Sequence, residues 1–210
     1  HKFNEKKLEV DSITAKFEDA RSKLNEEKSL KENDLNKKKE ELSNLQEEIK
    51  KDQPAIDQAL EEIKLLTDKD VGPIRLTKVS SFPSLKMILE ILCILTGISK
   101  ANTEKMLHDP QFPHSIISIK PESVNFDMVN QIKEYLNNEE LSPTSMESVA
   151  PILSTILQFI KALFNFGSHK IQINSLLTEI EIRQNDLNDF LKTMNESIIE
   201  IEKEEKKSQP

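Results

Sequence analysis

The chain has 210 residues, of which 31% are charged and 5% aromatic, and its formal net charge is −8. Its single cysteine excludes a disulfide within the chain, its three glycines exclude a glycine-rich phosphate-binding loop, and its negative charge argues against nucleic-acid binding. So little glycine predicts long helices with few tight turns.

Residues 1–70 are predicted to form a charged helical arm whose apolar residues recur every seven positions. One series is Phe3, Val10, Phe17 and Leu24, and a second is Leu35, Leu42, Ile49, Ile56 and Ile63. The step of eleven from Leu24 to Leu35 indicates a four-residue stutter between two heptad blocks. Because the blocks are flanked by charged residues, the arm is predicted to enter a coiled coil.

Residues 171–210 carry the same repeat. The seam positions expected here are Ile173, Ile180, Leu187, Met194 and Ile201, accompanied by Leu177, Leu191 and Ile198 in a second row that polar Gln184 interrupts. If the two arms are antiparallel, pairing Ile63 with Ile173 brings Leu35 level with Ile201. The first 30 residues would then lack a partner, which suggests a piece of a longer hairpin.

Residues 71–170 differ from the arms, since they hold all three glycines and seven of the nine prolines. Short amphipathic helices are expected from Pro83 to Leu95, after the Asn102–Thr103 cap, and over residues 126–136. A longer helix is expected to open at Ser142–Pro143 and run through Phe166, and no segment has the alternation of a strand. Cys93 lies between Leu92 and Ile94 and is expected to be a buried apolar residue.

The predicted fold is therefore all-α: an antiparallel two-stranded coiled-coil hairpin capped by a small globular helical-bundle domain. The expected parts are an incoming arm (1–70), a small helical domain (71–170) and a returning arm (171–210). No apolar segment opens the chain as a signal peptide would, and Glu90 interrupts the longest apolar run, Met87 to Leu95, so no membrane span is expected.

Four stretches, in this order, resemble the stalk and microtubule-binding domain of dynein heavy chains. They are "QPAIDQALEEIKLL" (53–66), "PIRLTKVSSFPSLKMILEILCILTG" (73–97), "QFPHSIISI" (111–119) and residues 131–166. Within the second stretch, the matching residues are Arg75, Pro83, Lys86, Glu90, Cys93 and Gly97.

The chain also departs from the family pattern. Where the family carries an arginine in the last domain helix, this chain has Ser148 or, in a gapped alignment, Thr144. A common tryptophan appears as Phe159, and a proline at the start of the return arm appears as Ser175. A basic pair near the end of the incoming arm reads "TDKD", residues 67–70. The resemblance is therefore to a divergent member, such as an axonemal one.

The resemblance implies that the central domain contacts the α- and β-tubulin of a microtubule and that the arms relay its binding state by a shift of coiled-coil register. It implies a cytoplasmic, cytoskeletal or ciliary axonemal setting, the remainder of the motor heavy chain as a partner, and an ATPase site outside this chain. The alternative is a structural coiled-coil hairpin that acts as a tether or scaffold through its central helical domain.

Tubulin's surface is acidic, so the contact residues are expected to be basic. Arg75, Lys78 and Lys86 lie in a stretch without carboxylates from Val71 to Leu89. Further candidates are Lys105 and Lys120, together with Thr144 and Ser148 at the position of the missing arginine.

Polar or small residues in the seams (Asp52, Ala59 and Gln184) would ease a register shift, and Pro54 would bend the helix. The four histidines have no metal-ligand spacing, and no catalytic, cofactor or metal site is expected.

Overall fold

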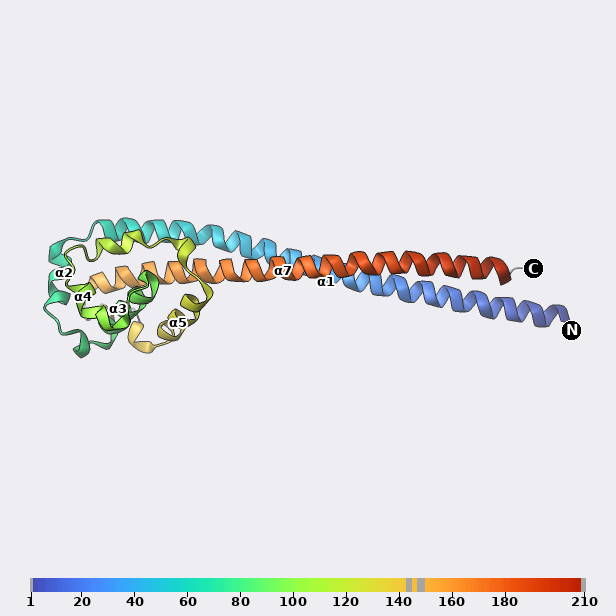
Figure 1. The fold of residues 1–210 in the computed structure, drawn as a ribbon, viewed down its shortest axis with the longest axis horizontal. Helices are drawn as coiled ribbons and strands as arrows, with labels where there is room; N and C mark the ends of the chain where they lie inside the picture. Colours follow the sequence, from blue (N-terminus) through green and yellow to red (C-terminus); the bar gives the residue numbers. More distant parts are fainter. Residues whose placement is uncertain (1, 143–144, 147–149, 209–210) are drawn as a thin grey trace. The chain divides into compact units, whose positions relative to one another are not determined.

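The structure is a computed structural model that describes residues 2–142, 145–146 and 150–208. Helices are the only regular secondary structure in these ranges, so the all-α prediction is confirmed. Two helices are long, α1 (Lys2–Lys64) and α7 (Pro151–Ser208). Between them lie α2 (Asp68–Arg75), α3 (Pro83–Thr96), α4 (Thr103–Leu107) and α5 (Phe126–Leu136), together with the short 3₁₀ turns η1 (Val79–Ser81), η2 (Lys100–Asn102), η3 (His114–Ser118), η4 (Pro121–Ser123) and η5 (Glu139–Leu141) (Figure 1).

The chain divides into two compact units. The first consists of His1–Ser43 and Ser175–Pro210, and the second is Asn44–Asn174. Helices α1 and α7 each contribute one part to either unit. The three-part division predicted from the sequence remains a prediction.

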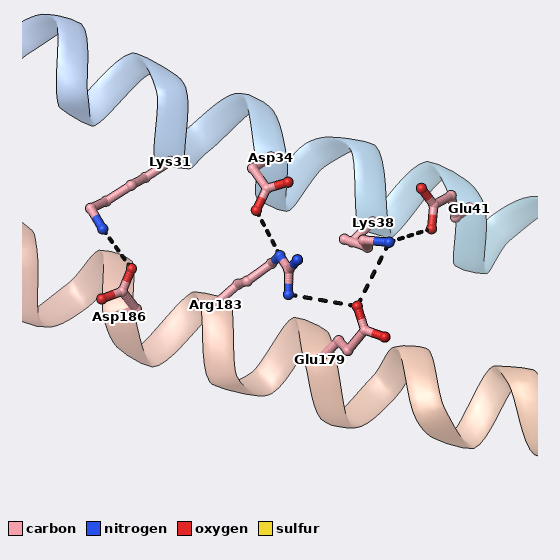
Figure 2. A network of polar contacts seen from close by, with 7 residues as sticks. All are labelled: Lys31, Asp34, Lys38, Glu41, Glu179, Arg183 and Asp186. Carbon is pink, nitrogen blue, oxygen red and sulfur yellow. Dashed lines mark hydrogen bonds and ion pairs between the residues drawn. The ribbon is translucent and has the colours of Figure 1, made fainter.

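In the first unit, α1 and α7 are joined by ion pairs between residues far apart in the sequence. Lys31 binds Asp186 (2.6 Å), Asp34 binds Arg183 (2.6 Å), and Lys38 lies 3.7 Å from Glu179 (Figure 2). As the residue number rises on α1, that of its partner on α7 falls. The two helices therefore run in opposite directions in this unit.

The register expected from the seam lengths is wrong. Asp34 and Lys31 bind Arg183 and Asp186, so this part of α7, not Ile201, lies level with Leu35. Arg21 binds Glu205 at 2.8 Å, so this part of α1, which was expected to lack a partner on α7, has one. The physical reason is that a heptad repeat matches itself at every step of seven, and seam length alone cannot choose among these registers.

One row of the returning helix was also misplaced. Leu177, expected in the seam, is 47% exposed, whereas its neighbour Leu176 is 8% exposed. The heptad-spaced residues Leu187 and Met194 are buried as expected, and Leu191 and Ile198 are half-buried. A one-residue error is easily made where two leucines are adjacent, because either fits a row with steps of three and four.

The core of the second unit is built around α3. Pro83 occupies the first turn, where its missing N–H costs no hydrogen bond, and Gly97 ends the helix with a left-handed φ of 70°. The residues of α3 that are buried lie on nearly every side of it: Ser84, Leu85, Ile88, Leu89, Ile91, Leu92, Cys93, Ile94 and Leu95. Helices α4 and α5 and turn η1 pack against them.

The free thiol of Cys93 is fully buried, and this burial raises its pKa, in line with the apolar role expected for it.

The helices expected from Pro83, after Asn102 and over residues 126–136 are present as α3, α4 and α5. The long helix expected from Ser142–Pro143 begins at Pro151 instead, and Pro143 lies outside the described residues. Helix α2 was not expected. Helix α2 starts at the "TDKD" segment. There the carboxylate of Asp70 accepts hydrogen bonds from the hydroxyl and the backbone N–H of Thr67, both at 2.7 Å. These hydrogen bonds lower the pKa of Asp70.

Gly167 lies where α7 meets Val124 and Val129, and a side chain there would collide with them. A Cβ built on Gly167 would lie 2.5 Å from Cγ1 of Val124 and 3.1 Å from Cγ2 of Val129. We therefore expect Gly167→Ala to lower the free energy of unfolding by about 1–3 kcal/mol, as measured by urea denaturation.

The matched control is Gly72→Ala in α2, where the added Cβ meets nothing within 4 Å. Alanine favours a helix over glycine, so this variant should be as stable as the parent or more stable by up to about 1 kcal/mol. Equal effects of the two substitutions would contradict the close packing of α7 on this part of the second unit.

Candidate functional site

Two of the predicted contact lysines lie on adjacent elements of the second unit. Lys78 is exposed and directly precedes η1, and the N–H of Val79 donates to Oε1 of Glu104 at 3.3 Å, which holds η1 against α4. Lys105 follows on α4 and is also exposed. Within the described ranges, neither lysine has a carboxylate within ion-pair distance. Both charges are therefore available to an acidic partner.

Lys86 is only partly available. It lies on the second turn of α3, and its side chain is 57% exposed, but its ammonium is 3.8 Å from Oε1 of Glu90 one turn later. The stretch without carboxylates that the sequence showed ends at Leu89, so helical geometry brings the next residue, Glu90, alongside Lys86. At 3.8 Å and with an exposed lysine the pair is weak, so the ammonium of Lys86 can move to another anion that approaches.

Arg75 has a structural role that the sequence did not reveal. Its guanidinium donates hydrogen bonds to the carbonyl oxygens of Leu107 (3.1 Å), Asp109 (2.8 Å) and Phe112 (3.1 Å). These carbonyls lie at the end of α4 and in the loop after it, where that of Asp109 also accepts from the N–H of Phe112, so one side chain ties the end of α2 to this loop. Nε and Nη2 of Arg75 are committed inside the unit and Nη1 lies 3.9 Å from Asp68, so Arg75 is not included in the proposed surface.

The remaining predicted contact residues lie elsewhere. Lys120 is exposed and precedes η4, where the carbonyl of Glu122 accepts a hydrogen bond from Lys170 of α7 at 2.9 Å. Lys120 is thus placed beside α7 and not on η1 or α4. Thr144 and Ser148 lie outside the described residues.

The predicted seam residues lie on the inner faces of the two long helices. Leu35, Ile56, Ile63, Leu187 and Met194 are buried, and Leu42, Ile49, Ile173, Ile180 and Ile201 are half-buried. In the part that belongs to the second unit, polar Asp52 lies in the companion row, one heptad before Ala59, and is 8% exposed. Its carboxylate is 2.7 Å from Nδ1 of His169 on α7. From the sequence, Asp52 was noted as a polar seam residue, but His169 was not recognised as its partner. The pattern that could have revealed the pair is that each arm has one polar residue facing the seam here.

The described residues contain no group of three or more His, Cys, Asp or Glu side chains that could hold a metal ion. Of the helices described, none is long and apolar enough to cross a membrane. The candidate residues for a contact are the exposed lysines Lys78, Lys105 and Lys86 of the second unit.

The three hydrogen bonds of Arg75 predict a specific loss of stability. Arg75→Lys keeps the charge but cannot reach three carbonyls in different directions, so we expect the free energy of unfolding to fall by about 1–3 kcal/mol in urea denaturation. Lys78→Arg, the reverse exchange at an exposed side chain, should change it by less than about 0.5 kcal/mol. A neutral Arg75→Lys would contradict the structural role.

The Asp52–His169 pair gives a second prediction. His169→Leu leaves a buried carboxylate without this partner and should cost about 1–3 kcal/mol of unfolding free energy. Asp52→Leu/His169→Leu removes both polar groups and should recover most of that loss, because apolar residues pack well in a seam. If the double variant is as unstable as the single one, the two side chains do not act as a pair.

No protein-family model matches this chain. Over 124 residues it is 25% identical to dynein axonemal heavy chain 1 of Mus musculus and of Rattus norvegicus, and 26% identical to that of Homo sapiens. Each match covers 51% of this chain, and the chain spans about 3% of the length of these curated relatives. The chain is thus distantly similar, over about half its length, to axonemal dynein heavy chains.

Proposed function

We propose that this chain is the microtubule-binding tip and stalk of a dynein motor heavy chain. In this proposal α1 and α7 form an antiparallel coiled-coil hairpin, and the helices between them form the domain that contacts tubulin. A change in coiled-coil register relays the binding state to the remainder of the motor, which carries the ATPase. No catalytic step is assigned to this chain, and its setting is the cytoskeleton, in an axonemal dynein the cilium.

The observation that carries the proposal is the distant similarity to axonemal dynein heavy chains over 124 residues. The antiparallel ion pairs of the first unit are what a hairpin stalk requires. The polar Asp52–His169 contact interrupts the apolar row in the second unit, and a change of register would separate this pair, so the pair distinguishes one alignment from another.

The contact surface that we propose consists of Lys78, Lys105 and Lys86. The first two have no ion-pair partner among the described residues, and the third has one, Glu90, at 3.8 Å. Because the whole chain carries a net charge of −8, a local group of cations is needed to bring it to an acidic surface. Such contacts act mainly on association and are weakened by salt.

The second candidate function is a structural hairpin that tethers another protein through its central domain. The commitment of Arg75 to the chain's own carbonyls favours it, since this removes one cation from the expected microtubule surface. The net negative charge favours it as well. Microtubule binding itself separates the two candidates.

Co-sedimentation with taxol-stabilised microtubules at low and at moderate salt tests the proposal. The parent chain should pellet with microtubules, and less so at the higher salt. Lys78→Glu/Lys86→Glu/Lys105→Glu should weaken binding by about tenfold or more, because three contacts change from attraction to repulsion.

A charge-matched control is Lys133→Glu/Lys192→Glu/Lys203→Glu, which alters three exposed lysines on α5 and α7. It should bind within about twofold of the parent at moderate salt, where charges more than about 10 Å from the contact are screened. Equal losses in the two variants would show that attraction is not localised. Absence of pelleting at both salts, with the helices fixed in any register by cross-links, would leave only the tether.

A further inference from the structure

The first unit contains a set of charges whose order along the two helices selects one register. Along α1 the signs alternate, with Lys31, Asp34 and Lys38, and along α7 they alternate in the complementary sense, with Asp186, Arg183 and Glu179 (Figure 2). We name these six residues the charge ladder. Arg183 also reaches Glu179 at 3.6 Å, and Lys38 reaches Glu41 at 2.8 Å, so neighbouring rungs are connected.

The basic members of the ladder lie in the rows where a coiled coil usually has apolar residues. Lys38 and Lys31 are one and two heptads before Leu45, which is half-buried, and Arg183 is one heptad after Leu176, which is buried. The side chains of Lys31, Lys38 and Arg183 are accordingly only 27%, 22% and 34% exposed. Their stems cover the seam while their charged ends reach the flank. One of the two inward rows is therefore not apolar here, although the other keeps buried Leu35 and Leu187, so charge pairs can contribute to the alignment.

Counting along the sequence shows what a slide of α7 past α1 would do. A slide of half a heptad is three or four residues in either direction, and each of these four slides breaks all three cross-helix pairs. The new neighbours include like charges every time: Asp34 meets Glu179 or Asp186, and Arg183 meets Lys31 or Lys38. Like charges in such positions are destabilising.

A slide of a whole heptad behaves differently. In one direction it places Lys38 opposite Asp186 and Glu41 opposite Arg183, and in the other it places Lys31 opposite Glu179 and Glu27 opposite Arg183. Two attractive pairs are thus available after either slide of seven residues. The order of the charges discriminates against half-heptad slides in particular.

We propose that the charge ladder is a register lock, which holds α1 and α7 in the observed alignment and opposes half-heptad slides in the first unit. A half-heptad slide must break three pairs together and bring like charges into contact. The lock is a property of the helix pair itself and goes beyond the proposed function, because it holds whether or not the second unit binds microtubules.

The lock also predicts which single substitution releases it. Arg183→Glu replaces the central attraction by repulsion from Asp34, and it turns the two contacts with lysine that penalise a half-heptad slide into attractions. The same change thus weakens the observed register and strengthens its competitors. Arg183→Gln only removes the attraction, so its effect should be smaller and in the same direction.

Double electron–electron resonance between two nitroxides measures the register directly. Labels at Asn25 and Asn185, in a Cys93→Ala background, lie at exposed positions that are offset along the helix axes. A half-heptad slide should move the labels by about 5 Å relative to each other along the helix axes, given a rise of 1.5 Å per residue, and change their separation by up to that amount. The experiment uses the whole chain and needs no microtubules, so its failure is distinct from failure of the proposed function.

The parent and the charge-matched control Lys192→Glu should each show one narrow distance distribution. Arg183→Glu should show a second population, displaced by up to about 5 Å and enriched severalfold over the parent. If Arg183→Glu reduces helicity in circular dichroism, Arg183→Gln decides, with a smaller displaced population expected. One unchanged distance in Arg183→Gln, and in Arg183→Glu if it remains helical, would overturn the register lock.

Discussion

Each of the two long helices has an inner face that must be covered by the other. Residues such as Leu35 and Leu187 in the first unit, and Ile56 and Ile63 in the second, are buried on helices whose remaining surface is almost entirely charged or polar. Isolated helices of this composition owe most of their stability to tertiary packing and little to propensity. The contact between α1 and α7 is therefore the interaction on which the other features depend, from the ion pairs of the first unit to the core around α3.

The two units use this contact in different ways. In the second unit it is part of a larger apolar core, where α3 is covered by α4, α5 and η1, and where Gly167 allows α7 to approach Val124. In the first unit the helices have only each other, and the row that would normally be apolar contains Lys31, Lys38 and Arg183. Where apolar burial is scarce, the alignment of the helices depends on charge. The proposed register lock therefore belongs to the first unit, and the proposed partner surface belongs to the second.

Much of the fold could be predicted from periodicity and punctuation, because these are local properties. Pro83 and Gly97 bound α3 as expected, and the heptad rows identified buried Leu35, Leu187 and Met194. The register could not be predicted in this way, since the repeat is the same at every seventh residue and only the side-chain pairs distinguish the alternatives. Arg75 was misread because a cation in a stretch without carboxylates looks free, whereas its partners are backbone carbonyls 32 to 37 residues further along the chain. His169 was missed because nothing on its own arm shows that Asp52 is opposite.

The most direct test of the account is the alignment of α1 with α7 in solution. Zero-length carbodiimide coupling joins lysines to carboxylates that are already in contact, and mass spectrometry identifies the joined peptides. At a dilution where isotope-mixed chains show no coupling between molecules, the account predicts coupling of Lys31 to Asp186 and of Lys38 to Glu179. Coupling of these lysines to Glu200 or Glu202 instead would place the Ile201 region level with Leu35 and contradict the account.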